Sequence, residues 1–163
     1  RMMISGQDPR YILRRLTRFA MEDVGLADPN AMQIALAAWQ IYERMGSPEG
    51  DIALRELVIY LATAPKSISA YKAQNASYRV ARDTGSLMPP KNILNAPTKM
   101  MKNMGYGDGY VYDPETETGC SGQNCFPEDM ERVSLYKPVE RGFEREIKKR
   151  FDYWNSFRKQ SKN

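Results

Sequence analysis

The chain has 163 residues, of which 24 are Lys or Arg, 20 are Asp or Glu, two are Cys, none is His, and 42% are hydrophobic. This length fits one globular domain, which buries roughly 70% of its unfolded surface and needs no disulfide or metal for stability. The composition excludes Ser/His and Cys/His nucleophile pairs, a histidine-based zinc site, a secreted disulfide scaffold and a membrane-spanning helix, so we expect a cytoplasmic protein without a membrane partner.

The first third of the chain alternates helical patterns with helix boundaries. Each of three segments starts at a capping residue followed by proline: Asp8–Pro9, Asp28–Pro29 and Ser47–Pro48. Each ends at a residue that stops a helix: Gly25, Gly46 and Pro65. Because capping oxygens satisfy free N–H groups and proline suits the first turn, the spacing predicts three consecutive helices. Their short connections predict antiparallel packing.

Hydrophobic residues recur at helical spacing in these three segments and form the predicted core. They are Ile12, Leu13, Leu16, Phe19 and Ala20 in the first, Met32, Leu36, Trp39 and Ile41 in the second, and Ile52, Leu54, Leu57, Val58 and Leu61 in the third. Spacings of three and four residues place such side chains on one side of a helix.

The rest of the chain contains two further helical patterns and a long irregular stretch. A fourth helix is predicted from about residue 67 to 83, and a short one at 98–104 follows a proline-containing connector at 86–97. Residues 105–127 have no helical period, and we predict irregular chain with one short strand at 110–112. The last 25 residues are predicted to form a long C-terminal helix.

Charge is distributed unevenly along the chain. Residues 108–131 contain seven acidic and no basic residues, whereas residues 141–163 contain eight basic and three acidic residues. Candidate nucleic-acid contacts on the terminal helix are Lys148, Lys149, Arg150, Arg158 and Lys159. The alternative is that they complement the helix dipole and form a solvated surface.

No residues are assigned to catalysis, to a cofactor or to a metal. Lys66–Ser67 resembles the end of a phosphate-binding loop but lacks its glycines, so a helix start is the better interpretation. Cys120 and Cys125 are interpreted as free thiols, with a disulfide as the alternative. The acidic residues at 113, 115 and 117 imitate an EF-hand without its glycine and closing glutamate, which favours a solvated loop.

Methionine is more abundant than a small core normally requires. The residues concerned are Met32, Met45, Met88, Met100, Met101, Met104 and Met130. Because methionine adapts to irregular contacts in cores and interfaces, this abundance favours self-association through hydrophobic surface.

Six segments, in one order along the chain, resemble the RarA/MgsA family of AAA+ ATPases. They are DPRYILRRL at 8–16, EDVGLADP at 22–29, LATAPKS at 61–67, NAPTK at 95–99, MGYGDGY at 104–110 and ERGFEREI at 140–147. The resemblance extends over essentially the whole chain. It implies a C-terminal part of such an ATPase, related to the eukaryotic Werner-helicase-interacting protein.

The resemblance implies a helical oligomerisation domain similar to the clamp-loader collar, formed by residues 1–163, with 1–4 as the remnant of the preceding AAA+ lid helix. It implies a homotetramer. The full-length protein is then a DNA-dependent ATPase of the bacterial replication fork, acting in recombination and repair. Its partners are single-stranded-DNA-binding protein and DNA, and its ATP and magnesium bind in an ATPase core that this chain lacks. The alternative is a DNA-binding module that uses the basic terminal helix.

Overall fold

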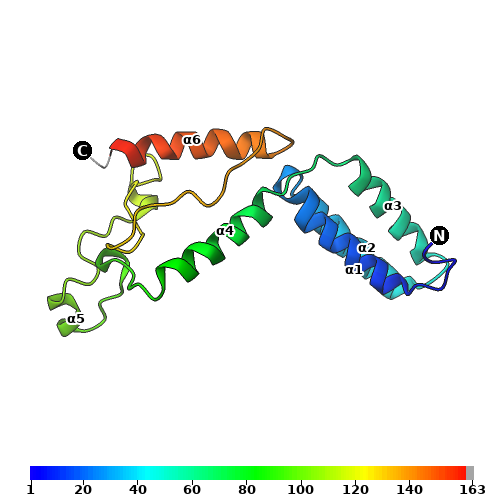
Figure 1. Ribbon diagram of the computed structural model, residues 1–163, viewed down its shortest axis with the longest axis horizontal. Coiled ribbons are helices and arrows are strands. Elements are labelled where there is room, and N and C mark those ends of the chain that lie inside the picture. The colour runs from blue at the N-terminus through cyan, green and yellow to red at the C-terminus, as the bar shows by residue number, and fades with distance from the viewer. Residues whose placement is uncertain (161–163) are drawn as a thin grey trace. The chain divides into compact units, whose positions relative to one another are not determined.

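The computed structural model describes residues 1–160, with the side chains of residues 159 and 160 left out. These residues form six α-helices and no strand (Figure 1). The helices are α1 (Pro9–Phe19), α2 (Asn30–Met45), α3 (Gly50–Thr63), α4 (Ser69–Thr84), α5 (Lys99–Asn103) and α6 (Glu144–Gln160). The prediction of a mainly α chain with a long C-terminal helix is therefore confirmed.

The described residues divide into two compact units. The three-helix unit contains residues 1–75 and 136–148, and the loop-rich unit contains residues 76–135 and those from 149 onward. The prediction that residues 1–163 form one domain, with 1–4 left from a lid helix, stays a prediction.

The first two helix starts of the three-helix unit follow the predicted capping. The third does not, because α3 begins at Gly50 without a side-chain cap and the Ser47 hydroxyl donates to the Asp51 carboxylate at 2.7 Å instead. The Asp8 carboxylate accepts a hydrogen bond from the Arg10 backbone N–H at 2.8 Å, and Asp28 accepts one from the Asn30 N–H at 3.1 Å. The first helix departs from the prediction only at its end, where a π-helical turn at Ala20–Val24 and a 3-10 turn at Gly25–Ala27 follow α1. The capping residues thus set where α1 and α2 begin.

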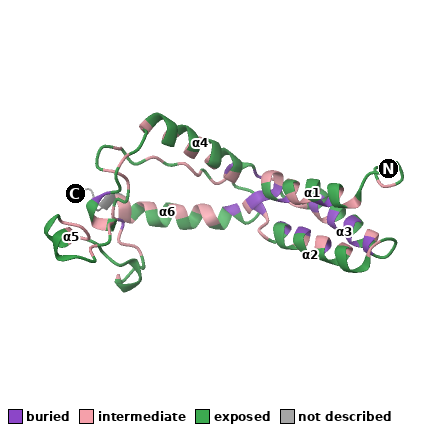
Figure 2. Ribbon diagram, turned by 90° about the horizontal axis from the view of Figure 1, so that it is seen from below, coloured by how far each residue is buried: buried purple, intermediate pink, exposed green. Residues whose placement is uncertain are grey.

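The core of the three-helix unit is built from leucines of α1 and α3 and alanines of α2 (Figure 2). Leu13, Leu57 and Leu61 are buried, and α2 buries only Ala31, Ala35 and Ala38. These alanines follow the spacing of one helix side, and their small size lets α2 lie close to its neighbours.

Five predicted core residues are exposed instead. They are Met32, Leu36, Ile41, Ile52 and Val58. Met32 and Leu36 each follow a buried alanine by one position, and successive helical residues are turned by about 100°. The alanine stripe, not the larger side chains, therefore decides which side of α2 faces the core.

The loop-rich unit has little buried apolar surface, since only Pro90 and Gly122 are buried among residues 76–135. The short helix predicted at 98–104 is confirmed as α5, and the Thr98 hydroxyl accepts from the Met101 N–H at 3.2 Å. The strand predicted at 110–112 is wrong. The Gln123 side chain takes the place of a strand partner, because its amide nitrogen donates to the Val111 carbonyl at 2.7 Å.

Candidate functional site

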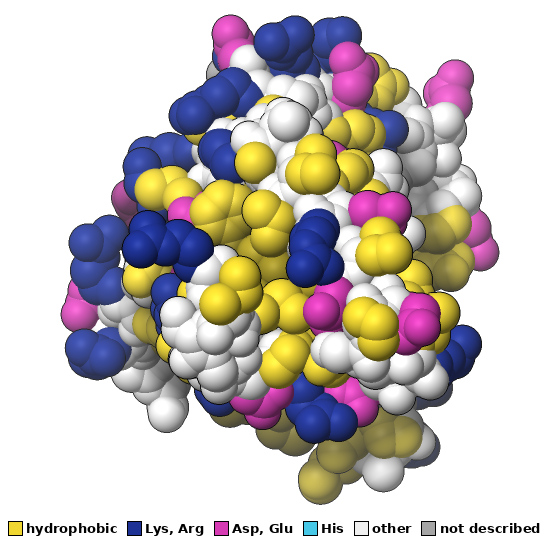
Figure 3. All heavy atoms as spheres, turned by 90° about the vertical axis from the view of Figure 1, so that its right-hand side faces the viewer, with side chains coloured by type: hydrophobic (Ala, Val, Ile, Leu, Met, Phe, Trp, Pro, Cys, Tyr) yellow, Lys and Arg dark blue, Asp and Glu magenta, His cyan; other side chains and the backbone are white. Residues whose placement is uncertain are grey.

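Large hydrophobic side chains lie exposed on α2 and α3 and form what we call the apolar surface. Its members are Met32, Leu36, Ile41, Met45, Ile52, Val58 and Ile59. Figure 3 looks onto the end at which α3 lies in Figure 1 and shows hydrophobic side chains at the surface between basic and acidic ones. Large hydrophobic side chains exposed on two neighbouring helices are frequent at interaction sites.

Helix α3 is hydrophobic on opposite sides. Its inner side buries Leu54, Leu57 and Leu61, while Ile52 and Ile59, seven residues apart and on the opposite side, are 58% and 65% exposed. Large hydrophobic side chains on the side of a helix away from the core often mark a surface that a partner covers. The outer side of α3 is therefore the part of this unit that most requires a covering partner.

The charged residues beside the outer side of α3 balance one another. Arg55 and Glu56 are both exposed and lie between Ile52 and Ile59 in the sequence. A surface with both signs of charge does not repel a second copy of itself, whereas a purely basic one would.

A buried carboxylate joins the returning chain to the α3–α4 connection. The Glu144 side chain is 0% exposed, and it accepts hydrogen bonds from the Ser67 hydroxyl at 2.8 Å, the Tyr136 hydroxyl at 2.7 Å and the Val139 N–H at 2.9 Å. The Ser69 hydroxyl adds a fourth donor at 3.3 Å. A buried charge is tolerated only with such partners. The pKa of Tyr136 is raised well above its usual range, mainly by burial of the hydroxyl and also by its hydrogen bond to Glu144.

Close backbone approaches surround this carboxylate. Gly142 has a φ of +53°, and a Cβ there would lie 2.0 Å from the carbonyl oxygen of Ala27. The neighbouring Phe143 N–H donates to that same oxygen at 2.8 Å. Gly25, with a φ of +54°, leaves 2.8 Å between a would-be Cβ and the Ser67 carbonyl oxygen. Only glycine fits both positions without a backbone shift. We call the contacts around Glu144, Gly142 and Gly25 the buried joint.

The buried joint brings together three of the six segments that carry the family resemblance, at 22–29, 61–67 and 140–147. Sequence reasoning missed Glu144, because a glutamate in the first turn of a predicted helix is normally exposed. The only signal was the glycine two positions earlier, which marks a place where the backbone comes close to another segment.

Lys66 and Ser67 do not fit a nucleotide phosphate. The Lys66 ammonium donates to the carbonyl oxygens of Leu61, at 2.7 Å, and Ala64, and so caps the end of α3. Ser67 is buried against the Glu144 carboxylate, which would repel a phosphate. The Ser69 N–H donates to the Ser67 hydroxyl at 3.2 Å where α4 begins, so the predicted helix start is confirmed.

The structure does not gather the candidate nucleic-acid contacts on one side of α6. Lys148, Lys149 and Arg150 are consecutive, so their side chains leave the helix about 100° apart. Lys148 forms an ion pair with Glu140. Arg158 donates to the Asn155 side chain at 2.9 Å, and the side chain of Lys159 lies outside the described residues. Their role in nucleic-acid binding stays a prediction.

The acidic segment uses its side chains for local contacts. Cys120 and Cys125 are free thiols, as predicted. Asp113 accepts hydrogen bonds from the Ser121 N–H at 2.8 Å and the Ser121 hydroxyl at 2.6 Å. Among the described residues, no three His, Cys, Asp or Glu side chains are grouped to hold a metal ion, and no helix is long and apolar enough to span a membrane.

Comparison with known proteins decides the family. Residues 1–155 match the family model described as MgsA AAA+ ATPase C terminal. The chain belongs to the MgsA/RarA family of AAA+ ATPases. It is the C-terminal domain of that family, and the resemblance drawn from the six sequence segments is confirmed.

Relatives in bacteria and in a eukaryote support the assignment. The chain is 42% identical over 163 residues to Replication-associated recombination protein A of Coxiella burnetii, covering 99% of this chain and 37% of that protein. It is 43% identical over 148 residues to the Escherichia coli K12 protein of that name, and the match covers 90% of this chain and 33% of that protein. The chain is 43% identical over 140 residues to ATPase WRNIP1 of Dictyostelium discoideum, and the match covers 85% of this chain and 15% of that protein. The chain spans about a third of the length of these bacterial relatives.

Proposed function

We propose that this MgsA/RarA C-terminal domain is an oligomerisation domain and that it forms a homotetramer through the apolar surface of α2 and α3. The observation that carries the proposal is the outer side of α3, where Ile52 and Ile59 are more than half exposed. Burying a side chain of this size contributes about 1.5–3 kcal/mol before the entropy lost on association. Four copies in the arrangement of the clamp-loader collar would hold their ATPase cores in a ring-like assembly.

The full-length protein, in this proposal, is a DNA-dependent ATPase that acts in replication-fork maintenance, recombination and repair. Support comes from relatives named Replication-associated recombination protein A, of which this chain spans about a third. ATP and magnesium would bind in the ATPase core of the full-length protein, because the matching family is one of AAA+ ATPases. DNA and single-stranded-DNA-binding protein would be the partners, in the bacterial cytoplasm at the replication fork.

The alternative function is DNA binding through the basic residues of α6. The two functions respond oppositely to salt, because buried apolar contacts are little screened, whereas phosphate contacts release counterions and weaken steeply. The spread of Lys148, Lys149 and Arg150 around α6 favours oligomerisation as the main role, since these three side chains do not face one direction.

Light scattering on the chain in low and high salt, with and without an oligothymidylate, tests both functions in one series. We expect a tetramer whose mass is unchanged between about 50 mM and about 500 mM salt, where the Debye length falls more than twofold. A monomer at micromolar concentration in both salts would contradict the proposal. A monomer that binds the oligonucleotide only in low salt would establish the alternative.

A further inference from the structure

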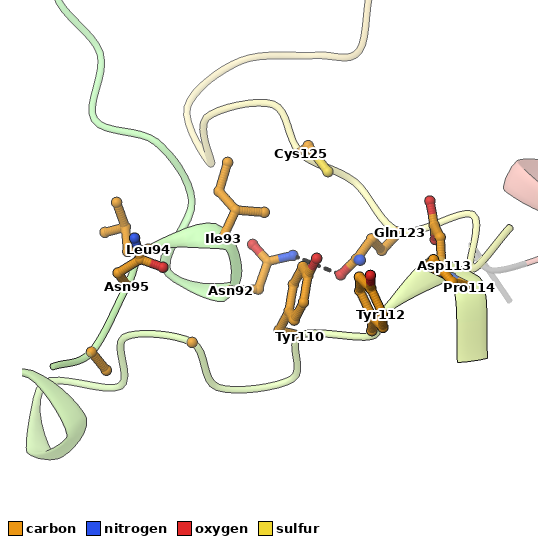
Figure 4. A pocket seen from close by; sticks show the side chains of 12 residues that line it. Asn92, Ile93, Leu94, Asn95, Tyr110, Tyr112, Asp113, Pro114, Gln123 and Cys125 are labelled. Carbon is orange, nitrogen blue, oxygen red and sulfur yellow. Dashed lines mark hydrogen bonds between the residues drawn. The ribbon is translucent and has the colours of Figure 1, made fainter. Parts of the chain in front are cut away.

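The loop-rich unit contains an open groove of about 690 Å³ that the oligomerisation proposal does not use. Its walls come from three segments, at 92–96, 107–114 and 123–125 (Figure 4). This volume lies within the range of pockets that hold small molecules or short peptide segments. Its aromatic and polar side chains are those of Tyr110, Tyr112, Asn92, Gln123 and Asp113.

One wall of the groove is aromatic. Tyr110 and Tyr112 are each 53% exposed, and they lie two residues apart, with their rings close together in Figure 4. Neither hydroxyl has a hydrogen-bond partner among the described residues. Such rings offer a flat hydrophobic surface and a polar tip, the combination that makes tyrosine frequent in binding sites.

The floor of the groove is held in place by side-chain amides. The Asn92 amide nitrogen donates to the Gln123 side-chain oxygen at 3.2 Å and to the Asn124 carbonyl at 3.3 Å. Gln123 is in turn fixed to the Val111 backbone at 2.7 Å and 3.4 Å. The tyrosines on either side of Val111 are thereby positioned before a ligand arrives, which lowers the entropy cost of binding.

The charge of the groove is negative. Among the described residues, Asp113 is the only charged one that lines the groove, and the segment 108–131 that supplies much of the wall has seven acidic and no basic residues. Hydrogen bonds from Ser121, with a smaller contribution from the nearby Arg158, lower the pKa of Asp113. A nucleic-acid backbone would be repelled here, whereas a cationic ligand would be attracted.

We propose that this groove binds an extended, proline-rich peptide segment of a partner protein that carries Lys or Arg. A polyproline II segment has no internal hydrogen bonds, so its carbonyl oxygens are open to donors such as the Tyr110 and Tyr112 hydroxyls. Its proline rings pack on aromatic walls, and its low flexibility reduces the cost of ordering. The cationic side chain would lie near Asp113.

Fluorescence anisotropy with the whole chain and a labelled ten-residue peptide of prolines with two arginines tests this site. We expect saturable binding that weakens at least about tenfold in a Tyr110→Ala/Tyr112→Ala double variant, as for aromatic hot spots. Tyr11→Ala, which removes an exposed tyrosine of α1, is the matched control and should leave the affinity unchanged. Asp113→Asn should weaken binding about threefold, and replacing both peptide arginines by glutamate should abolish it.

Two further measurements keep the result interpretable. Tyr110→Phe/Tyr112→Phe keeps the rings and removes the hydroxyls, so it should bind the peptide more tightly than the double alanine variant. Thermal melts followed by circular dichroism should show that all variants fold. Tighter binding of an oligothymidylate than of the peptide would overturn the proposal in favour of a nucleic-acid site. No saturation by millimolar peptide, or equal affinity of the folded double alanine variant, would also overturn it.

Discussion

The three-helix unit and the loop-rich unit are held together by different interactions. Apart from Pro90, all the buried hydrophobic residues in the described part of the chain lie between Leu13 and Leu61, in the three-helix unit. The loop-rich unit depends on side chains that hydrogen-bond to backbone, such as Gln123 to Val111 and Asp113 to Ser121. Apolar burial is cooperative and costly to undo, whereas partly exposed hydrogen bonds contribute about 1 kcal/mol each. We therefore expect the three-helix unit to resist local unfolding and the loop-rich unit to open at a smaller cost in free energy.

The largest expected effect of this difference is on amide hydrogen exchange. Amides of α1 and α3 should exchange at least about a hundredfold more slowly than amides of residues 105–135, because opening a buried core costs much more free energy than opening a solvated loop. Exchange measured by mass spectrometry on peptic fragments checks this. Equal protection in the two units would mean that the loop-rich unit has a second stabilising element.

Removing the buried carboxylate should destabilise the three-helix unit strongly. We expect Glu144→Ala to lower the free energy of unfolding by about 3–5 kcal/mol, since the Ser67 and Tyr136 hydroxyls lose a charged partner inside the protein. Urea denaturation provides the measurement. Glu117→Ala, at an exposed position of the loop-rich unit, is the control and should change stability by less than about 0.5 kcal/mol. Similar values for both variants would contradict the role assigned to the buried joint.

Two glycines allow the cost of lost packing space to be measured separately from the cost of an unfavourable backbone conformation. Gly142 and Gly109 both have positive φ, but a Cβ would lie 2.0 Å from the Ala27 carbonyl at the first and meet nothing within 4 Å at the second. Gly109→Ala should cost about 1–2 kcal/mol from conformation alone, and Gly142→Ala should cost clearly more. Thermal denaturation of the two variants measures the difference. Equal costs would show that residue 142 is not tightly enclosed.

The smallest effect concerns pH. The pKa of Tyr136 is raised in the folded state, so its contribution to stability is complete below the unfolded value of about 10 and is lost as the pH rises above it. Between about pH 9 and 11 the wild type should therefore lose more stability than Tyr136→Phe. Tyr11→Phe, at an exposed position, should follow the wild type. A Tyr136→Phe curve parallel to the wild type would remove the link between Tyr136 and the buried joint.

The helices could be predicted from the sequence because their signals are local. Proline after Asp8 or Asp28 and glycine at the helix ends depend only on neighbouring residues. The core side of α2 was predicted wrongly, because alanines such as Ala31 and Ala35 carry a weak hydrophobic signal beside Met32 and Leu36. The distance at which helices pack decides which side of α2 faces the core, and hydrophobic periodicity alone does not specify that distance.

The loop-rich unit and the buried joint were not predictable for two other reasons. Gln123 acts as a substitute strand partner through a side chain, and no sequence period marks that role. Glu144 and Ser67 are 77 residues apart, so only the folded chain brings them together. Three of the six family segments form the buried joint, but the sequence did not indicate that these three contact one another.

The most direct test of the central claim is the mass of a variant that carries charge on the outer side of α3. Ile52→Glu/Ile59→Glu places two carboxylates in the proposed interface, and light scattering should find monomers where the wild type is a tetramer. Ile4→Glu changes an isoleucine that is 93% exposed outside the apolar surface, and it should remain tetrameric. Circular dichroism should show that both variants are folded. A folded Ile52→Glu/Ile59→Glu variant that keeps the wild-type mass would contradict the assignment of α3 to the subunit interface.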